Sequence, residues 1–387
     1  MRRAMAWLLR ATVVCTLAGT VLTSAAATCA WPDWDAFRRS TISQDGRVID
    51  DSTDQQVTVS EGQSYALFFA LVANDRATFD KLLTWTENNL AQGDLTAHLP
   101  AWIWGKRTEG EHAGTWGVID ANPASDADLW IAYSLLEAGR LWNERRFTAL
   151  GTLLARRALR EETAVLPGLG RTLLPGPTGF HTSPDVWRLN PSYVPLQVMR
   201  RLAAMPGEDS SWKTLVDTSA RLILNTAPHG FSPDWVEYHK GRGFRPDTQT
   251  QAGGSYNAIR VYLWAGMMAP RDPLRTSVLQ AFRPMADYVR KQGDPPERVD
   301  TQSGTFGPNS GNGGFSAAVA PYLAALGQTD DARAQAQRAR DLAAQKPAGY
   351  YSQVLALFGL GHLDGHFRFE ADGTLVPAWK STCPATR

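Results

Sequence analysis

The sequence predicts an all-α protein whose helices form a two-layer toroid, and two observations carry this prediction. Residues 126–142 are apolar almost all round, which is typical of a helix buried on every side. Residues 76–90 place apolar side chains on one face and charged ones opposite, which is typical of an outer helix packed on an inner one. The alternation of strands and helices of a doubly wound sheet is missing. A helical solenoid is the alternative, although no repeat of fixed period supports it.

Helical patterns then continue along the chain. The expected helices cover residues 62–73, 76–91, 126–143, 145–160, 191–204, 212–226, 256–267, 274–291, 315–326, 330–344 and 348–360. One short strand is expected at Phe367–Phe369. The intervening segments are rich in glycine, proline and aromatic residues, and we expect long loops that line one mouth of the toroid at 98–124, 165–190, 228–255 and 293–314.

The composition is that of an ordinary globular protein. Of 387 residues, 43% are hydrophobic and 20% are charged, which excludes disordered and collagen-like chains. The formal net charge is +1, so there is no basic excess for a phosphate backbone, and no nucleic-acid partner is expected. The 14 tryptophans are unusual, and exposed tryptophan often marks a binding surface.

The N-terminus has the pattern of a secretory signal peptide. Arg2 and Arg3 precede an apolar run over residues 4–21, and the alanines at 25–27 offer a cleavage site. We therefore expect a signal peptide at 1–27 and a single catalytic domain at 28–387. The mature protein would lie in the periplasm or be secreted, without stable membrane insertion.

Two cysteines remain after this cleavage, one at each end of the mature chain. Export permits a disulfide between Cys29 and Cys383. Two unpaired thiols are an equally good interpretation, and the sequence leaves both open.

A candidate proton donor opens one of the expected helices. Ser60 and Gln63 have the spacing of a capping box, which places Glu61 in the first helical turn. The following Gly62 leaves room for a ligand to approach. The plain alternative is an exposed glutamate favoured by the helix dipole.

Two further acids open the buried helix. Ser125 is a candidate N-cap, and Asp126 and Asp128 follow it in the first turn, at the level of Glu61 if both helices are inner ones. Acids gathered at one mouth of a ring could supply the paired carboxyl groups that cleave glycosidic bonds. The alternative is that at least one of them only caps the helix. No calcium-loop motif supports a metal site.

Aromatic residues concentrate in the predicted loops. They are Trp102, Trp104 and Trp116 in one loop, Trp187 and Tyr193 in another, and Trp235 and Tyr238 in a third. Pyranose rings pack their C–H faces on aromatic rings, so such a row suits a sugar chain, although some of these residues are expected in the core.

Together these motifs resemble glycoside hydrolase family 8. The family signature is similar to residues 124–142, ASDADLWIAYSLLEAGRLW, and the likeness extends over essentially the whole mature chain. Segments 30–34, 60–65, 100–106, 230–235 and 258–262 are similar to the members of this family that accompany bacterial cellulose synthesis.

The resemblance implies an (α/α)6 barrel, a toroid of six helical hairpins with an open substrate cleft. It implies endo-1,4-β-glucanase activity with inversion at the anomeric carbon and no metal or organic cofactor. The partners would be β-1,4-glucan chains and the cellulose synthesis and export machinery. Chitosan, xylan and mixed-linkage glucan stay open as substrates.

The resemblance also assigns roles. Glu61 matches the proton donor, Asp126 holds the distorted sugar, and Arg260 holds the polar network of the site. The expected substrate-binding residues are Tyr65, Trp102, Trp104, Asp128, Trp187, Tyr193, Tyr256 and Arg260.

One departure from the family concerns its general base. The family has Tyr-Asp-Ala where this chain has Tyr256, Asn257 and Ala258, and that Asp is the base. An amide cannot accept the proton at neutral pH, although Asn257 could orient the water through its amide oxygen. Three hypotheses follow. In the first, Asp247 replaces the base. In the second, the enzyme is slow, and bulk water or Asp126 acts in place of the base; in the third, the protein binds glucan with little hydrolysis.

Overall fold

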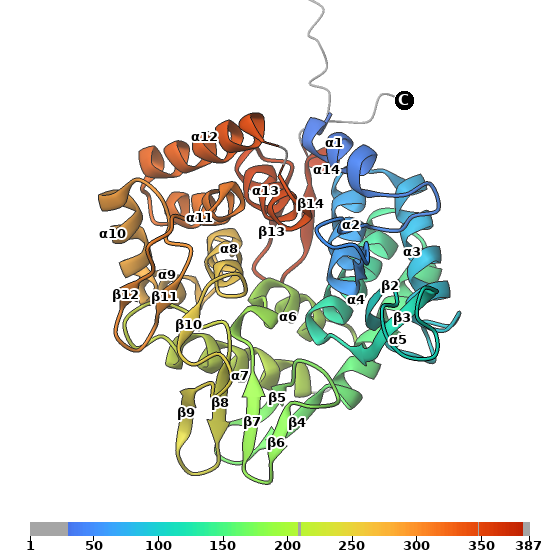
Figure 1. Cartoon of the computed structure of the whole chain (residues 1–387), viewed down its shortest axis with the longest axis horizontal. Coiled ribbons are helices and arrows are strands. Elements are labelled where there is room, and N and C mark those ends of the chain that lie inside the picture. The colour runs from blue at the N-terminus through green and yellow to red at the C-terminus, as the bar shows by residue number, and fades with distance from the viewer. Residues whose placement is uncertain (1–29, 208–209, 347, 382–387) are drawn as a thin grey trace, which may run out of the picture.

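The computed structural model describes residues 30–207, 210–346 and 348–381, and they form a two-layer ring of helices, the (α/α)6 barrel (Figure 1). Around the centre lie the inner helices α2 (Ser60–Val72), α4 (Ser125–Leu141), α6 (Leu196–Ala203), α8 (Ile259–Met267), α11 (Gly313–Ala325) and α13 (Tyr350–Leu363). Outside them lie α1 (Pro32–Thr41), α3 (Arg76–Leu90), α5 (Arg145–Glu161), α7 (Ser211–Asn225), α9 (Arg275–Ala281), α10 (Arg283–Gln292) and α12 (Thr329–Gln345). The predicted fold class is confirmed.

Burial explains which helices are inner. In α4, every residue except Arg140 is buried, and α2 is buried apart from Glu61. In α5, by contrast, buried residues recur on one stripe (Phe147, Gly151, Leu154, Ala155 and Ala158) that faces α4. One continuous apolar core joins the inner helices, because each of them contributes buried apolar side chains to it.

The two ends of the ring differ. Short connections lead from an inner helix to the next outer one, as at residues 73–75 between α2 and α3 and 142–144 between α4 and α5. Most connections back to an inner helix are long and carry the strands. All of these insertions therefore lie at the end of the ring where the inner helices begin, and we call this end the mouth.

The predicted long loops contain small antiparallel sheets, which the sequence analysis missed. The strands are β1 (Thr58–Val59), β2 (Ala101–Lys106), β3 (Trp116–Pro123), β4 (Thr163–Leu166), β5 (Gly170–Leu173), β6 (His181–Ser183), β7 (Val186–Leu189), β8 (Val236–His239), β9 (Gly243–Pro246), β10 (Gly253–Gly254), β11 (Val299–Asp300) and β12 (Thr305–Phe306). They form the sheets β1-β2-β3, β4-β5, β6-β7-β8-β9 and β10-β11-β12. These strands are short and interrupted by bulges, so they lack the regular alternation that predicts a strand.

Near the C-terminus, the expected strand at Phe367–Phe369 is confirmed as β13. It pairs with β14 (Leu375–Pro377), which leads into α14 (Ala378–Ser381).

Prolines explain two differences from the predicted helices. The helix predicted at 274–291 is divided into α9 and α10 around Phe282, because Pro284 is favoured in a first helical turn and lacks an N–H for the preceding one. The helix predicted at 191–204 begins as a 3-10 turn, Pro191–Tyr193, and α6 starts only after Pro195. This interruption places Tyr193 at the mouth instead of inside a helix.

The capping interpretations of Ser60 and Ser125 are wrong. Neither serine caps its helix with a side-chain hydrogen bond, and both are helical. Gln63 instead uses its amide to bind Val48 N, Gly46 O and Thr86 Oγ1, which ties the N-terminal loop to α3. The signal peptide at 1–27 and the two cysteines lie outside the described residues.

Candidate active site

Arg260 joins two acids at the mouth. Each of these residues lies in the first turn of its own inner helix, so the ring brings together side chains that are far apart in sequence. Arg260 Nη1 donates to the carboxylate of Glu61 and lies 3.3 Å from Asp126 Oδ2. The same nitrogen donates to the hydroxyl of Tyr65 at 3.1 Å. The structure therefore gathers three predicted site residues on one guanidinium nitrogen of a fourth, Arg260.

The other nitrogen of this guanidinium holds Asn257. Arg260 Nη2 donates to Asn257 Oδ1 at 2.7 Å and to Ser192 Oγ at 3.0 Å. Asn190 Nδ2 donates to the same Asn257 oxygen at 3.1 Å. Because this oxygen already accepts two hydrogen bonds, it is not free to orient a water, and the interpretation given to Asn257 is corrected in this respect.

Burial sets the ionisation of the second acid. Asp126 is 3% exposed, and burial raises its pKa to about 7, with Arg260 opposing the rise and Glu61 adding to it. Asp126 Oδ1 also accepts the N–H of Ala127 at 2.8 Å. Burial therefore favours the protonated form of this carboxyl group, which can donate a hydrogen bond to a sugar hydroxyl, whereas its ionised form can accept one.

Two tyrosines that sequence reasoning missed complete the surroundings of Glu61. Tyr350 is the first residue of α13, and its hydroxyl lies 3.5 Å from Glu61 Oε1. A Cβ on Gly62 would lie 2.8 Å from that hydroxyl, so glycine permits the approach. Tyr351 donates to the backbone oxygen of Tyr256 at 2.6 Å. Both tyrosines lie in the first turn of an inner helix, as Glu61 and Asp126 do. This shared position was the feature of the sequence from which they could have been predicted.

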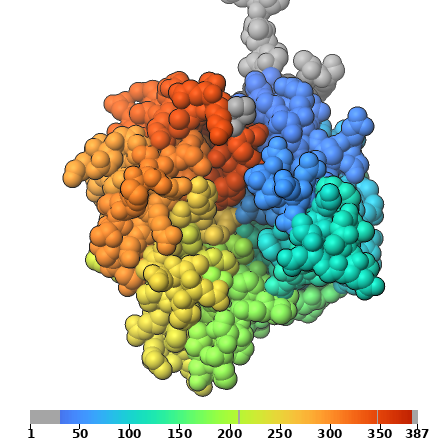
Figure 2. All heavy atoms as spheres, viewed as in Figure 1, coloured from blue at the N-terminus to red at the C-terminus, as the bar shows by residue number. Residues whose placement is uncertain are grey.

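Exposed aromatic side chains lie on the β2–β3 hairpin. Trp102 is 37% exposed and Trp116 is 45% exposed. Trp104 stacks on Trp116 with ring centroids 5.5 Å apart, and the guanidinium of Arg47 lies over both rings. In Figure 2 this hairpin (teal) stands across the face from the β8–β9 hairpin (yellow).

A second aromatic group lies beside Arg260. The ring of Tyr193 lies 5.6 Å from the Arg260 guanidinium and 5.9 Å from Trp235. Tyr256, which is 44% exposed, donates its hydroxyl to Glu297 Oε1 at 3.1 Å. The structure therefore places Trp102, Tyr193 and Tyr256 where a sugar chain at the mouth could contact them.

Two expected substrate-binding residues lie elsewhere. Asp128 is fully buried and faces Glu162, within hydrogen-bonding reach, and burial raises the pKa of both carboxyl groups. Trp187 is 7% exposed because His181 stacks on its face at 4.8 Å. Both assignments are corrected, since neither side chain offers a surface to a substrate. The ring of Tyr65 is also buried, and only its hydroxyl group reaches the site.

Asp247, the expected replacement for the general base, is shielded from solvent. Its side chain has no exposed surface, and Arg188 binds both of its oxygens, at 2.8 and 3.2 Å. Thr250 donates to Oδ2 through its N–H and its hydroxyl, both at 2.7 Å. Burial alone would raise the pKa of Asp247, but these hydrogen bonds hold it below the ordinary value. A water cannot reach this carboxylate, so the role of base is corrected too.

The described residues contain no cluster of three or more histidine, cysteine or acidic side chains able to hold a metal ion. Across the same part of the chain, no helix is long and apolar enough to cross a membrane.

Known proteins resemble this chain over most of its length. It matches the sequence model of Glycosyl hydrolases family 8 over residues 7–365. An Endoglucanase of Escherichia coli (strain K12) is 49% identical over 364 residues, which are 93% of this chain and 94% of that protein.

Solved structures agree with this match. An endo-1,4-D-glucanase from Vibrio fischeri ES114 superposes with a TM-score of 0.85 at 46% identity, covering 90% of this chain and 99% of that one. A GH8 endo-beta-1,4-glucanase from an Achatina fulica gut metagenomic library gives a TM-score of 0.71 at 25% identity over 87% of this chain and 99% of that one. The chain therefore belongs to glycosyl hydrolase family 8 and is a glycoside hydrolase.

Proposed function

We propose that this glycoside hydrolase is an endo-1,4-β-glucanase, which cleaves internal β-1,4-glucosidic bonds of cellulose and cello-oligosaccharides with inversion. The observation that carries the proposal is that Arg260 holds Glu61 and Asp126 together at the mouth, with the ring of Tyr193 beside the guanidinium. The relatives from Escherichia coli and Salmonella typhi that bear the name Endoglucanase support the choice of reaction.

In this mechanism, the glycosidic oxygen between two glucose units lies beside Glu61. Glu61 donates its proton to that oxygen as the bond to the anomeric carbon breaks. Asp126, one guanidinium nitrogen away, holds a hydroxyl of the distorted sugar on the same side. Tyr193 and Trp102 pack against neighbouring glucose rings, and a water attacks from the opposite face of the sugar.

The test is the hydrolysis of cellohexaose by residues 28–387, with Glu61→Gln as the matched control. We expect cellotriose, cellobiose and cellotetraose as early products of the native chain, and no products from the variant, which keeps the size and hydrogen bonding of Glu61. Release of glucose or cellobiose alone from one end would contradict the endo mode of cleavage. Full activity of Glu61→Gln would contradict the assignment of the acid.

A glucan-binding protein with little or no hydrolysis is the second candidate. The observation that favours it is Asn257, an amide at the position of the family's base, whose oxygen is bound by Arg260 and Asn190. Cellohexaose binding by the native chain without any cleavage would support this candidate over the first.

The compartment and the partners belong to the same proposal. The signal pattern at 1–27 supports export to the periplasm or the medium, and the similarity to family members of cellulose-synthesising bacteria supports work beside the cellulose synthesis and export machinery. Replacing the native gene with Glu61→Gln tests the coupling. Altered cellulose assembly is expected, and unaltered assembly would indicate that cleavage is incidental.

A further inference from the structure

Inverting hydrolysis needs a base as well as an acid, and the described site offers few candidates. The acid and base of inverting enzymes lie about 6.5–9.5 Å apart, which leaves room for a water. Asp126 is too close for this role, because it and Glu61 bind one nitrogen of Arg260. Asn257 has no group that accepts a proton, and Asp247 is closed off by Arg188.

Asp234 is a carboxylate that lies directly beside Asn257. Its Oδ1 accepts three backbone N–H groups of the turn that leads into α8, from Ser255 at 2.9 Å, Asn257 at 2.9 Å and Ala258 at 2.7 Å. No described residue donates a hydrogen bond to Oδ2 with ordinary geometry. The side chain is only partly buried and lines an open cavity of 410 Å³ with Gln251 and Arg298, so water can reach it.

A chain of contacts connects Asp234 to Glu61 without a direct contact between the two carboxyl groups. Glu61 binds one nitrogen of Arg260, the other nitrogen binds the side chain of Asn257, and the backbone of Asn257 binds Asp234. The two carboxyl groups are thus linked only through the Arg260 guanidinium and Asn257, and no single group binds both. Glu61 and Asp126, by contrast, share a single nitrogen of Arg260.

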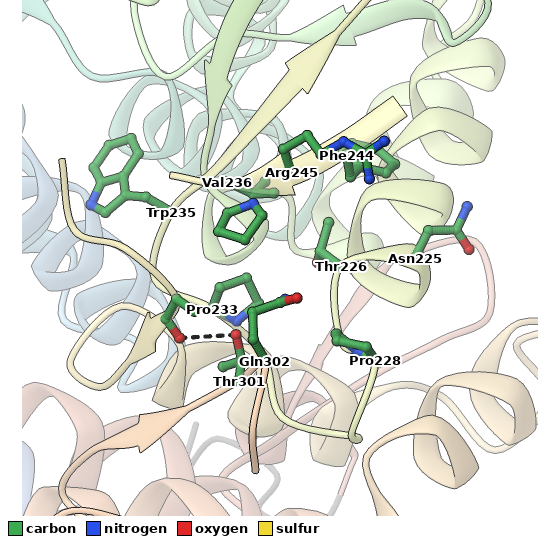
Figure 3. Close-up of a pocket in the computed structure, with 12 residues that line it drawn as sticks. Asn225, Thr226, Pro228, Pro233, Trp235, Val236, Phe244, Arg245, Thr301 and Gln302 are labelled. Atoms are coloured by element: carbon green, nitrogen blue, oxygen red, sulfur yellow. Dashed lines mark hydrogen bonds between the residues drawn. The ribbon is translucent and has the colours of Figure 1, made fainter. Parts of the chain in front are cut away.

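Local contacts fix the Asp234 carboxylate in place. Its own N–H donates to the Gly253 oxygen at 2.8 Å. Gly254 passes so close to the same segment that a Cβ would lie 2.2 Å from the oxygen of Ser232. The hydroxyl of Thr301 holds the Ala252 oxygen at 2.9 Å, as the dashed line in Figure 3 marks, beside the cavity lined by Pro233 and Trp235, the neighbours of Asp234.

The electrostatic environment also suits a proton acceptor. Burial raises the pKa of Asp234 above its ordinary value, although the three N–H groups and the charge of Arg260 oppose the rise. A carboxylate with a raised pKa is a stronger base near neutral pH.

We propose that Asp234 is the catalytic base of this enzyme, taking the role that Asn257 cannot perform; the inference rests on the proposed function. A water beside Asp234 Oδ2 attacks the anomeric carbon and forms the new C–O bond, while its proton passes to Asp234. The glycosidic C–O bond breaks, and its oxygen takes the proton of Glu61. Asp234 then releases its proton to solvent and Glu61 regains one, so that one water is consumed for each bond cleaved.

The test compares Asp234→Asn with the native chain on cellohexaose. Asparagine keeps the Oδ1 acceptor for the three N–H groups, so the thermal midpoint should hardly change while kcat falls about 10²–10⁴-fold. The matched control is Asp300→Asn, because Asp300 is an exposed carboxylate whose Oδ1 also accepts two backbone N–H groups, and kcat should not change.

Rescue separates a catalytic base from a structural carboxylate. In the Asp234→Asn background, Asn257→Asp supplies a new carboxylate at the adjacent position. The double variant should therefore have a kcat at least tenfold higher than that of Asp234→Asn alone. Azide, which attacks without needing a base, should also restore cleavage and yield an α-glucosyl azide. Peptide mass spectrometry should show an unmodified Asn257 in the native chain.

Several outcomes would overturn the proposal. They are unchanged kcat in Asp234→Asn, a loss that neither Asn257→Asp nor azide repairs, and a native chain in which residue 257 has deamidated to aspartate. In each of these cases the endoglucanase function can still stand. Absence of cleavage by both the native chain and Asn257→Asp would instead contradict the proposed function itself.

Discussion

Arg260 donates a 2.7 Å hydrogen bond to the side-chain oxygen of Asn257, so the amide at this position is held by the same cation as the acid of the site. An aspartate could occupy the place without moving its neighbours, since it would accept the same bond. What Asn257 lacks here is a group that accepts a proton, while its side-chain oxygen still accepts hydrogen bonds from Arg260 and Asn190.

Asn257→Asp should therefore change the native enzyme little. If Asp234 already accepts the proton, a second carboxylate adds no new step, and kcat on cellohexaose should stay within about tenfold of the native value. The measurement is initial-rate kinetics of both proteins. A rise of about 100-fold or more would mean that the native chain works without an effective base.

Arg260→Lys should impair the enzyme far more than its conserved charge suggests. The guanidinium binds five side chains in a fixed geometry, and an ammonium group cannot reproduce it. We expect kcat to fall by about 10²-fold or more and the thermal midpoint to fall as well, because Glu61 and Asp126 lose their shared partner. Arg290→Lys, at an exposed ion pair with Asp331, is the control and should leave both unchanged. A fully active Arg260→Lys would contradict the view that this residue organises the site.

Trp102→Ala should weaken binding without slowing the chemical step. Trp102 is 37% exposed on β2 and is not part of the Arg260 cluster. Loss of an aromatic contact at the centre of a binding surface costs about 1–2 kcal/mol, so KM for cellohexaose should rise about tenfold at similar kcat. Leu153→Ala, an exposed apolar residue on α5, is the control. An unchanged KM would place the sugar chain away from the β2–β3 hairpin.

Glu162→Gln should make stability less dependent on pH. Burial raises the pKa of both Glu162 and Asp128; the neighbouring Asp128 raises the pKa of Glu162 further, whereas the hydrogen bond with Glu162 lowers that of Asp128. A carboxyl group whose pKa is raised by folding contributes to stability at pH values below its ordinary pKa. This contribution is lost as the pH rises through the pKa of the group in the folded protein. The native thermal midpoint should thus decline toward alkaline pH.

The variant removes one of these two titrating groups and leaves an amide that can donate to Asp128. Its free energy of unfolding should exceed that of the native chain by about 1–3 kcal/mol near pH 9, with a smaller difference near pH 5. The exposed Glu109→Gln is the control, measured by thermal unfolding across the pH range. Parallel pH profiles of the native chain and Glu162→Gln would refute the shared burial of the pair.

Sequence patterns predicted the ring but not its insertions. The helix expected at 126–143 is found at Ser125–Leu141, because a buried helix must be apolar all round and this is visible in one segment. The sheets at the mouth depend on pairing between strands such as β7 and β8, which lie about 50 residues apart in the sequence. No local sequence pattern therefore predicts these sheets.

The residues of the site likewise include some that the sequence predicts and others that it does not. Glu61, Asp126 and Arg260 could be predicted because each opens an inner helix within a recognisable motif. Asp247 failed as a base because its partner Arg188 comes from another strand, 59 residues away, and spacing along the chain does not reveal such an ion pair. Asp234 lay within a quoted motif, yet its contact with the start of α8 appears only in three dimensions.

The stereochemistry of the first product tests the account most directly. Proton NMR of cellohexaose hydrolysis during the first minutes, before the sugars mutarotate, identifies the anomer that the enzyme releases. An acid at Glu61 and a base across the Arg260–Asn257 contact predict the α-anomer first, because water attacks the face opposite the broken β-bond. Initial release of the β-anomer would contradict the account, since it requires a covalent intermediate and a nucleophile on the opposite face.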